Sequence, residues 1–176
     1  HVVCRRQRQM CIRDSTIAYL YKRASTMGGS LKTKENKSPT FLVWAMADAQ
    51  GTNLQRVQII KGWLDNGESK EKVFDATCSD GLEVDKSSHR CPDNGAKVNL
   101  NDCSITKNKG SRELKTLWKD PEFIEDQEAF YYVRVLENPV CRWSTWDAIR
   151  SNQLPRSDIK STIQERAWSS PIWITN

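Results

Sequence analysis

The sequence predicts a mainly β domain, an antiparallel β-sandwich-like fold with one or two short helices and a long irregular loop. Three observations support this prediction. Several segments alternate apolar and polar residues with a period of two, as half-buried strands do. An Asn-Gly pair, Asn66-Gly67, separates two of these segments and is typical of a tight hairpin. Only two short segments have helical spacing, so strands dominate the predicted fold.

The first predicted strand, 41–48, is a short apolar run that begins just after Pro39, and its length favours a buried strand. The hairpin follows it. The segments predicted as strands are, in chain order, 41–48, 54–64, 72–77, 129–137 and 170–175.

Alternation within two of these segments predicts which side chains face the core. In 54–64, Val57, Ile59 and Trp63 share one face, whereas Arg56 and Gln58 lie on the other. In 129–137, the shared apolar face consists of Tyr131, Val133 and Val135. Pro171 in the last segment suits the start of a strand or an edge strand.

The two predicted helices are short. Segment 111–119 has Leu114, Leu117 and Trp118 at helical spacing, with Ser111 as the expected N-cap. Segment 144–150 begins with Ser144 and has Asp147 three residues later, an arrangement close to a capping box. Between the hairpin and the first of these helices, residues 78–108 predict a long irregular loop.

The first fifteen residues, HVVCRRQRQMCIRDS, change how the charge of the chain is interpreted. Residues 5–15 resemble the in-frame translation of a transposase-end sequencing adapter, so we expect residues 1–15 to be a non-native, disordered segment and residues 16–176 to be the domain. Four of the 27 basic residues and one of the 22 acids fall in this segment, which leaves 23 bases, 21 acids and a net charge of +2. The sequence therefore gives little reason to expect nucleic acid as a partner. It also contains no run of 18 apolar residues that would span a membrane.

Four cysteines remain in the expected domain, and they favour two disulfides and hence an exported protein. The candidates are Cys78, Cys91, Cys103 and Cys141. Four cysteines allow three pairings, and the sequence does not choose among them. Reduced, buried cysteines of a cytosolic protein are the alternative.

Residues that would point to catalysis are scarce. Beyond the adapter-like segment, His89 is the only histidine, and without a C-x-x-C pair it cannot complete a usual zinc site. His89 lies in a polar turn, where an exposed histidine is more common than a catalytic one. We therefore expect no catalytic residue and no metal ligand in this chain.

Four tryptophans allow a further function, because exposed indole rings can stack on sugars. Large aromatic side chains are more often core residues, so burial is the expected state. The four are Trp143, Trp146, Trp168 and Trp173.

Several motifs resemble the C-terminal region of a large bacterial family, domain-of-unknown-function family 3604. The two most specific are AFYYVRVLENPVCRWSTWDAIR at 129–150 and TIQERAWSSPIW at 162–173. QRVQIIKGW at 55–63 and RCPDNG at 90–95 fit the same family in the same order. Members of that family are longer, and their N-terminal half resembles metal-dependent hydrolases of the polymerase and histidinol phosphatase type.

The resemblance implies that this chain is a non-catalytic accessory domain. Its partner would be the N-terminal catalytic domain of the same protein, which would hold the divalent metal, and its location would be periplasmic or secreted. The residues expected to bind ligand or to contact that domain are Arg142, Trp143, Glu165 and Arg166. The alternative is a carbohydrate-binding or adhesion module that uses exposed tryptophans.

Overall fold

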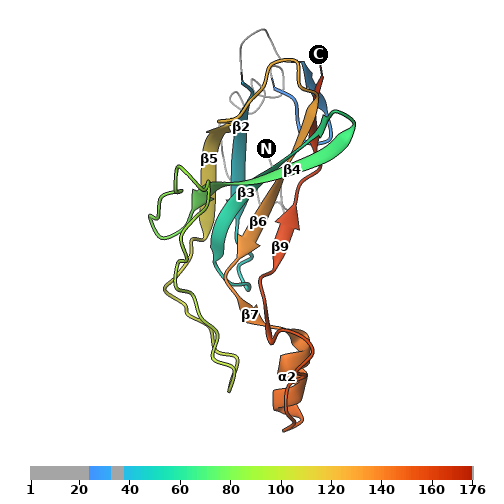
Figure 1. The fold of residues 1–176 in the computed structure, drawn as a ribbon. Helices are drawn as coiled ribbons and strands as arrows, with labels where there is room; N and C mark the ends of the chain where they lie inside the picture. The colour runs from blue at the N-terminus through green and yellow to red at the C-terminus, as the bar shows by residue number, and fades with distance from the viewer. Residues whose placement is uncertain (1–23, 33–37, 176) are drawn as a thin grey trace.

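The computed structural model describes residues 24–32 and 38–175 (Figure 1). The segment predicted to derive from an adapter lies outside the described residues. The strands are β1 (Ser30–Lys32), β2 (Thr40–Met46), β3 (Leu54–Asp65), β4 (Glu68–Cys78), β5 (Glu113–Lys119), β6 (Ala129–Glu137), β7 (Val140–Cys141), β8 (Thr162–Ile163), β9 (Arg166–Trp168) and β10 (Ile172–Thr175). A single helix, α2 (Trp143–Arg150), lies between β7 and β8 in the described part of the chain.

The largest sheet has the strand order β1-β10-β6-β3-β4, and β9 pairs with β6 beyond the segment that β10 covers. Its pairings are antiparallel except for β1 with β10, which are parallel. Strands β2 and β5 form a second, two-stranded sheet, and β7 and β8 form a third. The predicted mainly β, antiparallel fold is therefore confirmed.

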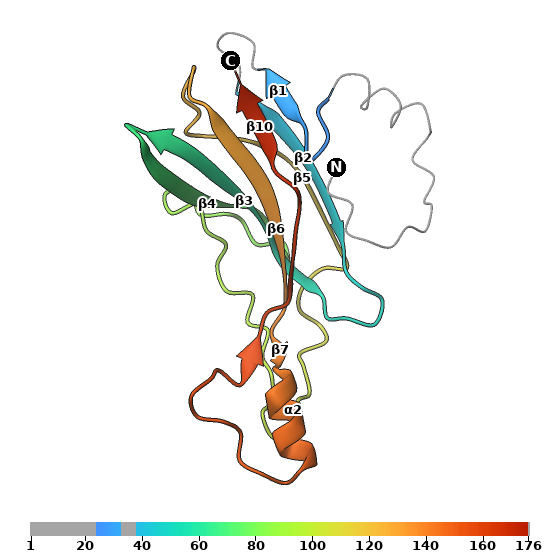
Figure 2. The same ribbon diagram turned by 90° about the vertical axis from the view of Figure 1, so that its right-hand side faces the viewer.

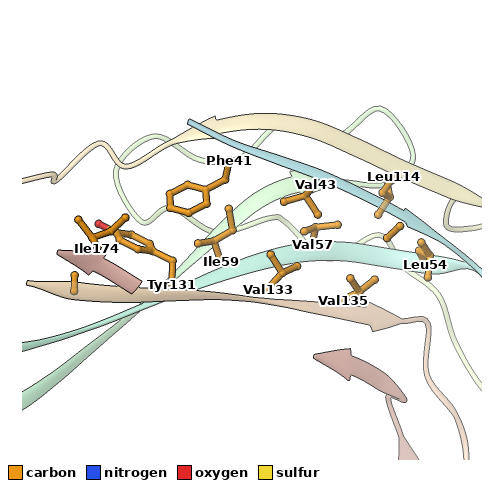
Figure 3. Close-up of a cluster of buried hydrophobic side chains, with 12 residues drawn as sticks. Phe41, Val43, Leu54, Val57, Ile59, Leu114, Tyr131, Val133, Val135 and Ile174 are labelled. Carbon is orange, nitrogen blue, oxygen red and sulfur yellow. The ribbon is translucent and has the colours of Figure 1, made fainter. Parts of the chain in front are cut away.

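The small β2-β5 sheet covers one face of the large sheet, which we call the inner face (Figure 3). Side chains from both sheets meet there and form the apolar core. Its buried members are Phe41, Val43, Ala45, Leu54, Val57, Ile59, Leu114, Ala129, Tyr131, Val133, Val135 and Ile174. The predicted apolar faces of 54–64 and 129–137 both point into this core.

The predicted hairpin is confirmed. Strands β3 and β4 pair antiparallel from Asp65↔Glu68 to Arg56↔Cys78. Asn66 has φ 52° and Gly67 has φ 84°. These positive φ values are what a two-residue turn between right-twisted strands requires, and Asn and Gly tolerate them best.

The helix predicted over 111–119 is wrong. Those residues form β5, which pairs with β2 along its full length, from Met46↔Glu113 to Thr40↔Lys119. Leu114 is buried and Trp118 packs on the core, whereas Leu117 is 71 % exposed. The pattern therefore has a period of two, and pairing with a strand distant in sequence overrides the weak local helical spacing.

The second predicted helix is present as α2, although its predicted cap is wrong. The helix begins one residue earlier than expected, and its N-cap is Arg142, which makes no side-chain capping hydrogen bond. Thr145 instead anchors this first turn, since its hydroxyl donates to the Ser161 carbonyl at 2.8 Å.

The long loop between β4 and β5 is irregular, as predicted, and two disulfides hold it. Cys78 pairs with Cys91, which closes the start of the loop onto the end of β4. Cys103 pairs with Cys141, which ties the far end of the loop to β7. The tip of this loop and the α2 region project together from one end of the sandwich (Figure 2).

Candidate functional site

The outer face of the large sheet, opposite the core, carries a buried carboxylate. The Asp75 side chain is fully buried and accepts hydrogen bonds from Gln58 at 2.6 Å and from the Cys91 amide at 2.7 Å. Arg56 forms an ion pair with it at 3.1 Å, and Arg90 lies 3.4 Å away. A buried charge is tolerated when such donors surround it, so Asp75 fixes the loop that carries Cys91 onto the sheet.

A second group of buried polar side chains continues this network. Gln55 donates to Asn94 at 3.1 Å, and Asn94 donates to Asn138 at 2.9 Å. Gln164 donates to Gln55 at 2.9 Å and so connects the segment before β9. Side-chain amides therefore connect the loop, the end of β6 and the segment before β9 to β3.

Above this network lies an open groove of about 650 Å³, bounded by the loop, the β7–β8 region and the segment leading into β9. It is lined by Gln55, Arg56, Cys91, Asp93, Ala96, Pro139, Arg142, Lys160, Thr162, Ile163, Gln164 and Arg166. Four of these side chains are basic and one is acidic. We call this feature the basic groove.

The basic groove brings together two of the residues singled out from the sequence, Arg142 and Arg166. Glu165 is exposed and is not among the residues that line it. Trp143 is 73 % exposed at the start of α2 and is also not part of the lining. Among the described residues, Glu165 forms no ion pair with either arginine.

The Glu165 carboxylate instead affects the pKa of Glu137, which lies at the end of β6. Burial raises the pKa of the Glu137 carboxyl above its ordinary value, and the nearby charges of Glu165 and Asp48 raise it further. The Glu137 amide also donates to the Glu165 carbonyl at 2.9 Å. Three acidic side chains thus interact at this end of the sheet, and the Arg112 charge offsets part of their effect on the pKa of Glu137.

The other half of the outer face carries four aromatic rings, of which the two tryptophans are exposed and the other two are half-buried. On β6, Phe130 and Tyr132 point outward, because their neighbours in sequence alternate into the core. Trp173 of β10 pairs across from Phe130, with ring centroids 5.1 Å apart, and Trp168 of β9 pairs across from Arg134. We call Phe130, Tyr132, Trp168 and Trp173 the aromatic face; of its strands, β6 and β9 are labelled in Figure 1 and β10 in Figure 2.

The prediction that the four tryptophans are core residues is wrong. Trp168 is 58 % exposed, Trp173 is 49 % exposed and Trp146 is 37 % exposed, in addition to Trp143. Trp173 lies on the solvent side of β10, whose alternate residues Ile172 and Ile174 pack in or against the core, and Trp168 lies on the outer face of the short strand β9. Trp143 and Trp146 lie on a helix that projects from the sandwich, where little chain is available to cover them.

Titratable groups elsewhere in the fold serve structural roles. His89 packs its ring on Phe74, and its Nε2 lies 3.5 Å from a Glu122 carboxylate oxygen. Lys61 and Tyr131 both contact the buried Asp120, at 2.8 Å and 2.7 Å. Burial and the Asp120 hydrogen bond raise the pKa of Tyr131 above its usual range. In residues 24–32 and 38–175, no group of three or more His, Cys, Asp or Glu side chains could hold a metal ion.

Sequence reasoning missed Arg56, Asp75, Lys160 and Gln164. One signal was available for Arg56, which was already assigned to the polar face of its strand. The other three come together only through pairing between segments far apart in the chain. Asp75 in particular looks like an ordinary strand polar residue until the loop closes over it.

The two disulfides bear on the environment of the chain. Both bonds fit an oxidising, extracellular environment. In the described part of the chain, no helix is long and apolar enough to cross a membrane.

Comparison with known protein families matches residues 5–176 to the family described as protein of unknown function (DUF3604). The match begins inside the segment predicted to be adapter-derived, and that assignment stays a prediction. No curated protein and no solved structure matches the chain significantly. The chain therefore belongs to the DUF3604 family.

Proposed function

We propose that this chain is a non-catalytic accessory domain of an exported, metal-dependent hydrolase, and that it packs against the catalytic region of the same protein. The observation that carries the proposal is the aromatic face. Two tryptophans about half exposed, on regular strands of a well-formed sheet, form an apolar surface that a free-standing domain has no reason to keep.

The surroundings of the aromatic face resemble the composition of protein interfaces. Such interfaces concentrate Trp, Tyr, Phe and Arg at their centre and keep other polar groups at the rim. Here Arg134 lies beside Trp168 on the same face, with its Nε held by Gln58 at 2.7 Å. Arg166 lies two residues before Trp168, at the boundary with the basic groove. A partner on this face would therefore reach the groove as well.

This arrangement gives the predicted interface residues a common role. With a partner seated on the aromatic face, Arg166 would lie between that partner and the basic groove. Arg142 would form part of the groove wall, while Trp143 and Glu165 would lie at its margin. The domain would then shape one wall of a substrate cleft, and the catalytic chemistry and the divalent metal would belong to the partner region.

The test is a binding measurement between this chain and the N-terminal region of a longer DUF3604 protein. We expect saturable binding by calorimetry for the unchanged chain. Trp168→Ala combined with Trp173→Ala should weaken it by about a hundredfold, since two central aromatic anchors carry much of the affinity of such an interface. Leu117→Ala, at an even more exposed position of β5 on the opposite layer, is the control and should bind normally.

The alternative, a carbohydrate-binding module, uses the same rings and gives a different result. Saturable binding of neutral oligosaccharides that depends on Trp168 and Trp173, with no binding to the N-terminal region, would replace the accessory-domain proposal. The unchanged chain, the double tryptophan variant and Leu117→Ala together distinguish these two outcomes.

A further inference from the structure

We infer that the basic groove is a binding site for an oxyanion in the class of phosphate, sulfate or carboxylate, either free or carried on a small polar molecule. This inference goes beyond the proposed docking role and does not depend on it. The basic groove has a volume of about 650 Å³, a size that suits a small-molecule ligand.

The first argument is the geometry of Arg142 and Arg166. Arg142 Nε donates to the Lys160 carbonyl at 3.1 Å, and Arg166 Nε donates to the Gln164 carbonyl at 3.3 Å. Each guanidinium is thus held at one nitrogen by the backbone. Within the described residues, the terminal nitrogens of both arginines have no hydrogen-bond partner and no carboxylate within ion-pair distance. An anchored guanidinium with free terminal donors is suited to bidentate contact with an oxyanion.

The second argument is the register of the sheet. Arg56 of β3 pairs with Leu136 of β6, and Leu136 pairs on its other side with Arg166 of β9. Arg56 and Arg166 therefore lie in one row on the same face, about 10 Å apart at their backbones, since neighbouring strands are about 5 Å apart. The space between the two side chains lies over Leu136.

The third argument is charge. Arg56 is compensated by Asp75, and its Nε and Nη1 already donate to Gln55, Asp75 and the Cys91 carbonyl, so it adds no free charge to the groove. Arg142, Lys160 and Arg166 are not compensated in the described part of the structure. The one acidic residue in the lining is Asp93, whose carboxylate accepts the Gly95 amide at 3.1 Å. The lining as a whole therefore favours an anion.

The fourth argument is rigidity. Arg142 follows directly on Cys141, which is bonded to Cys103, and the Arg142 amide donates to the Ser161 carbonyl at 2.9 Å. Pairing with β7 also holds Thr162 and Ile163 of β8, which follow shortly after Lys160. A site held on paired strands and a disulfide is preorganised for its ligand.

The experiment is a titration of the unchanged chain at low ionic strength with inorganic phosphate, glucose 6-phosphate and glucose, followed by NMR shifts and calorimetry. We expect saturable binding of both phosphate-bearing probes and none of glucose. Tighter binding of glucose 6-phosphate than of inorganic phosphate would identify an ester-bearing molecule as the ligand, and equal binding would identify the free anion.

Arg142→Gln and Arg166→Gln should each weaken this binding about tenfold, the effect of losing one charge-assisted contact. The matched control is Arg150→Gln, because Arg150 lies on α2 over the Trp146 ring and outside the groove. An equal loss in the control, or no saturable binding of either phosphate probe, would overturn the inference. Neither result would bear on docking through the aromatic face.

Discussion

The inner and outer faces of the large sheet are built from the same strands and are stabilised in different ways. The inner face is apolar and is covered by the β2-β5 sheet, as Figure 3 shows. The outer face is divided in two. One half is covered by the long loop through a buried polar network, and the other half is the exposed aromatic face.

This difference shows which part of the molecule is available for contact. On the inner face, the apolar side chains of both sheets are buried against one another. On the outer face, the loop places basic groups beside exposed rings, and the basic groove and the aromatic face adjoin at Arg166 and Trp168. The features that point to function are therefore on one side of one sheet.

The largest effect that would test this comparison is expected at Asp75. Asp75→Ala should lower the free energy of unfolding by about 4 kcal/mol, because it leaves a largely buried arginine without its counter-charge. Urea unfolding measures this, with Asp93→Ala in the exposed part of the loop as control. A loss below about 1 kcal/mol would mean that the polar network does not hold the loop on the outer face.

A slightly smaller loss in the free energy of unfolding is expected for a substitution on the inner face. Ile59 is completely buried between the two layers. Ile59→Ala should cost about 3 kcal/mol, because it removes buried methyl groups and leaves a cavity. The same urea series shows whether the two faces are coupled: for independent sites, the double variant with Asp75→Ala loses the sum of both effects.

The smallest expected effect is a pH-dependent gain in stability when Glu137 is substituted. Because the pKa of Glu137 is raised in the folded protein, the folded state holds this proton more tightly than the unfolded chain does. The contribution of Glu137 to stability is therefore greatest below the ordinary pKa of 4.5, declines as the pH rises toward the raised pKa, and stays reduced above it. Glu137→Gln should thus stabilise the protein at neutral pH by on the order of 0.5 kcal/mol, and not at low pH. Equal thermal stability of the two proteins at pH 7 would argue against the like-charge cluster.

Local patterns in the sequence were sufficient to predict much of the inner face. Alternation in 54–64 and 129–137 placed Val57, Ile59, Tyr131, Val133 and Val135 in the core, and the Asn-Gly pair located the hairpin. These features depend on neighbouring residues only. Segment 111–119 was misassigned because Leu114 and Trp118 fit helical spacing as well as a period of two, and its partner β2 lies far away in the chain.

The outer face could be predicted only in part, for the same reason. Arg142 and Arg166 were identified as candidates from motifs, but their position beside Arg56 depends on the register of three strands. The disulfide pairing and the burial of Asp75 likewise require the loop to fold back onto the sheet. The exposure of Trp168 and Trp173 was not predicted, since alternation alone does not say which face of a strand is covered.

The most direct test of the central claim, that the outer face is the contact surface, is hydroxyl-radical footprinting of this chain with and without the N-terminal region of a longer DUF3604 protein. The method reads the exposure of individual side chains. We predict that Trp168 and Trp173 lose reactivity in the mixture, whereas Met46 and Leu117, exposed on the small sheet, keep theirs. Protection of Met46 and Leu117 with unchanged tryptophans would contradict the account.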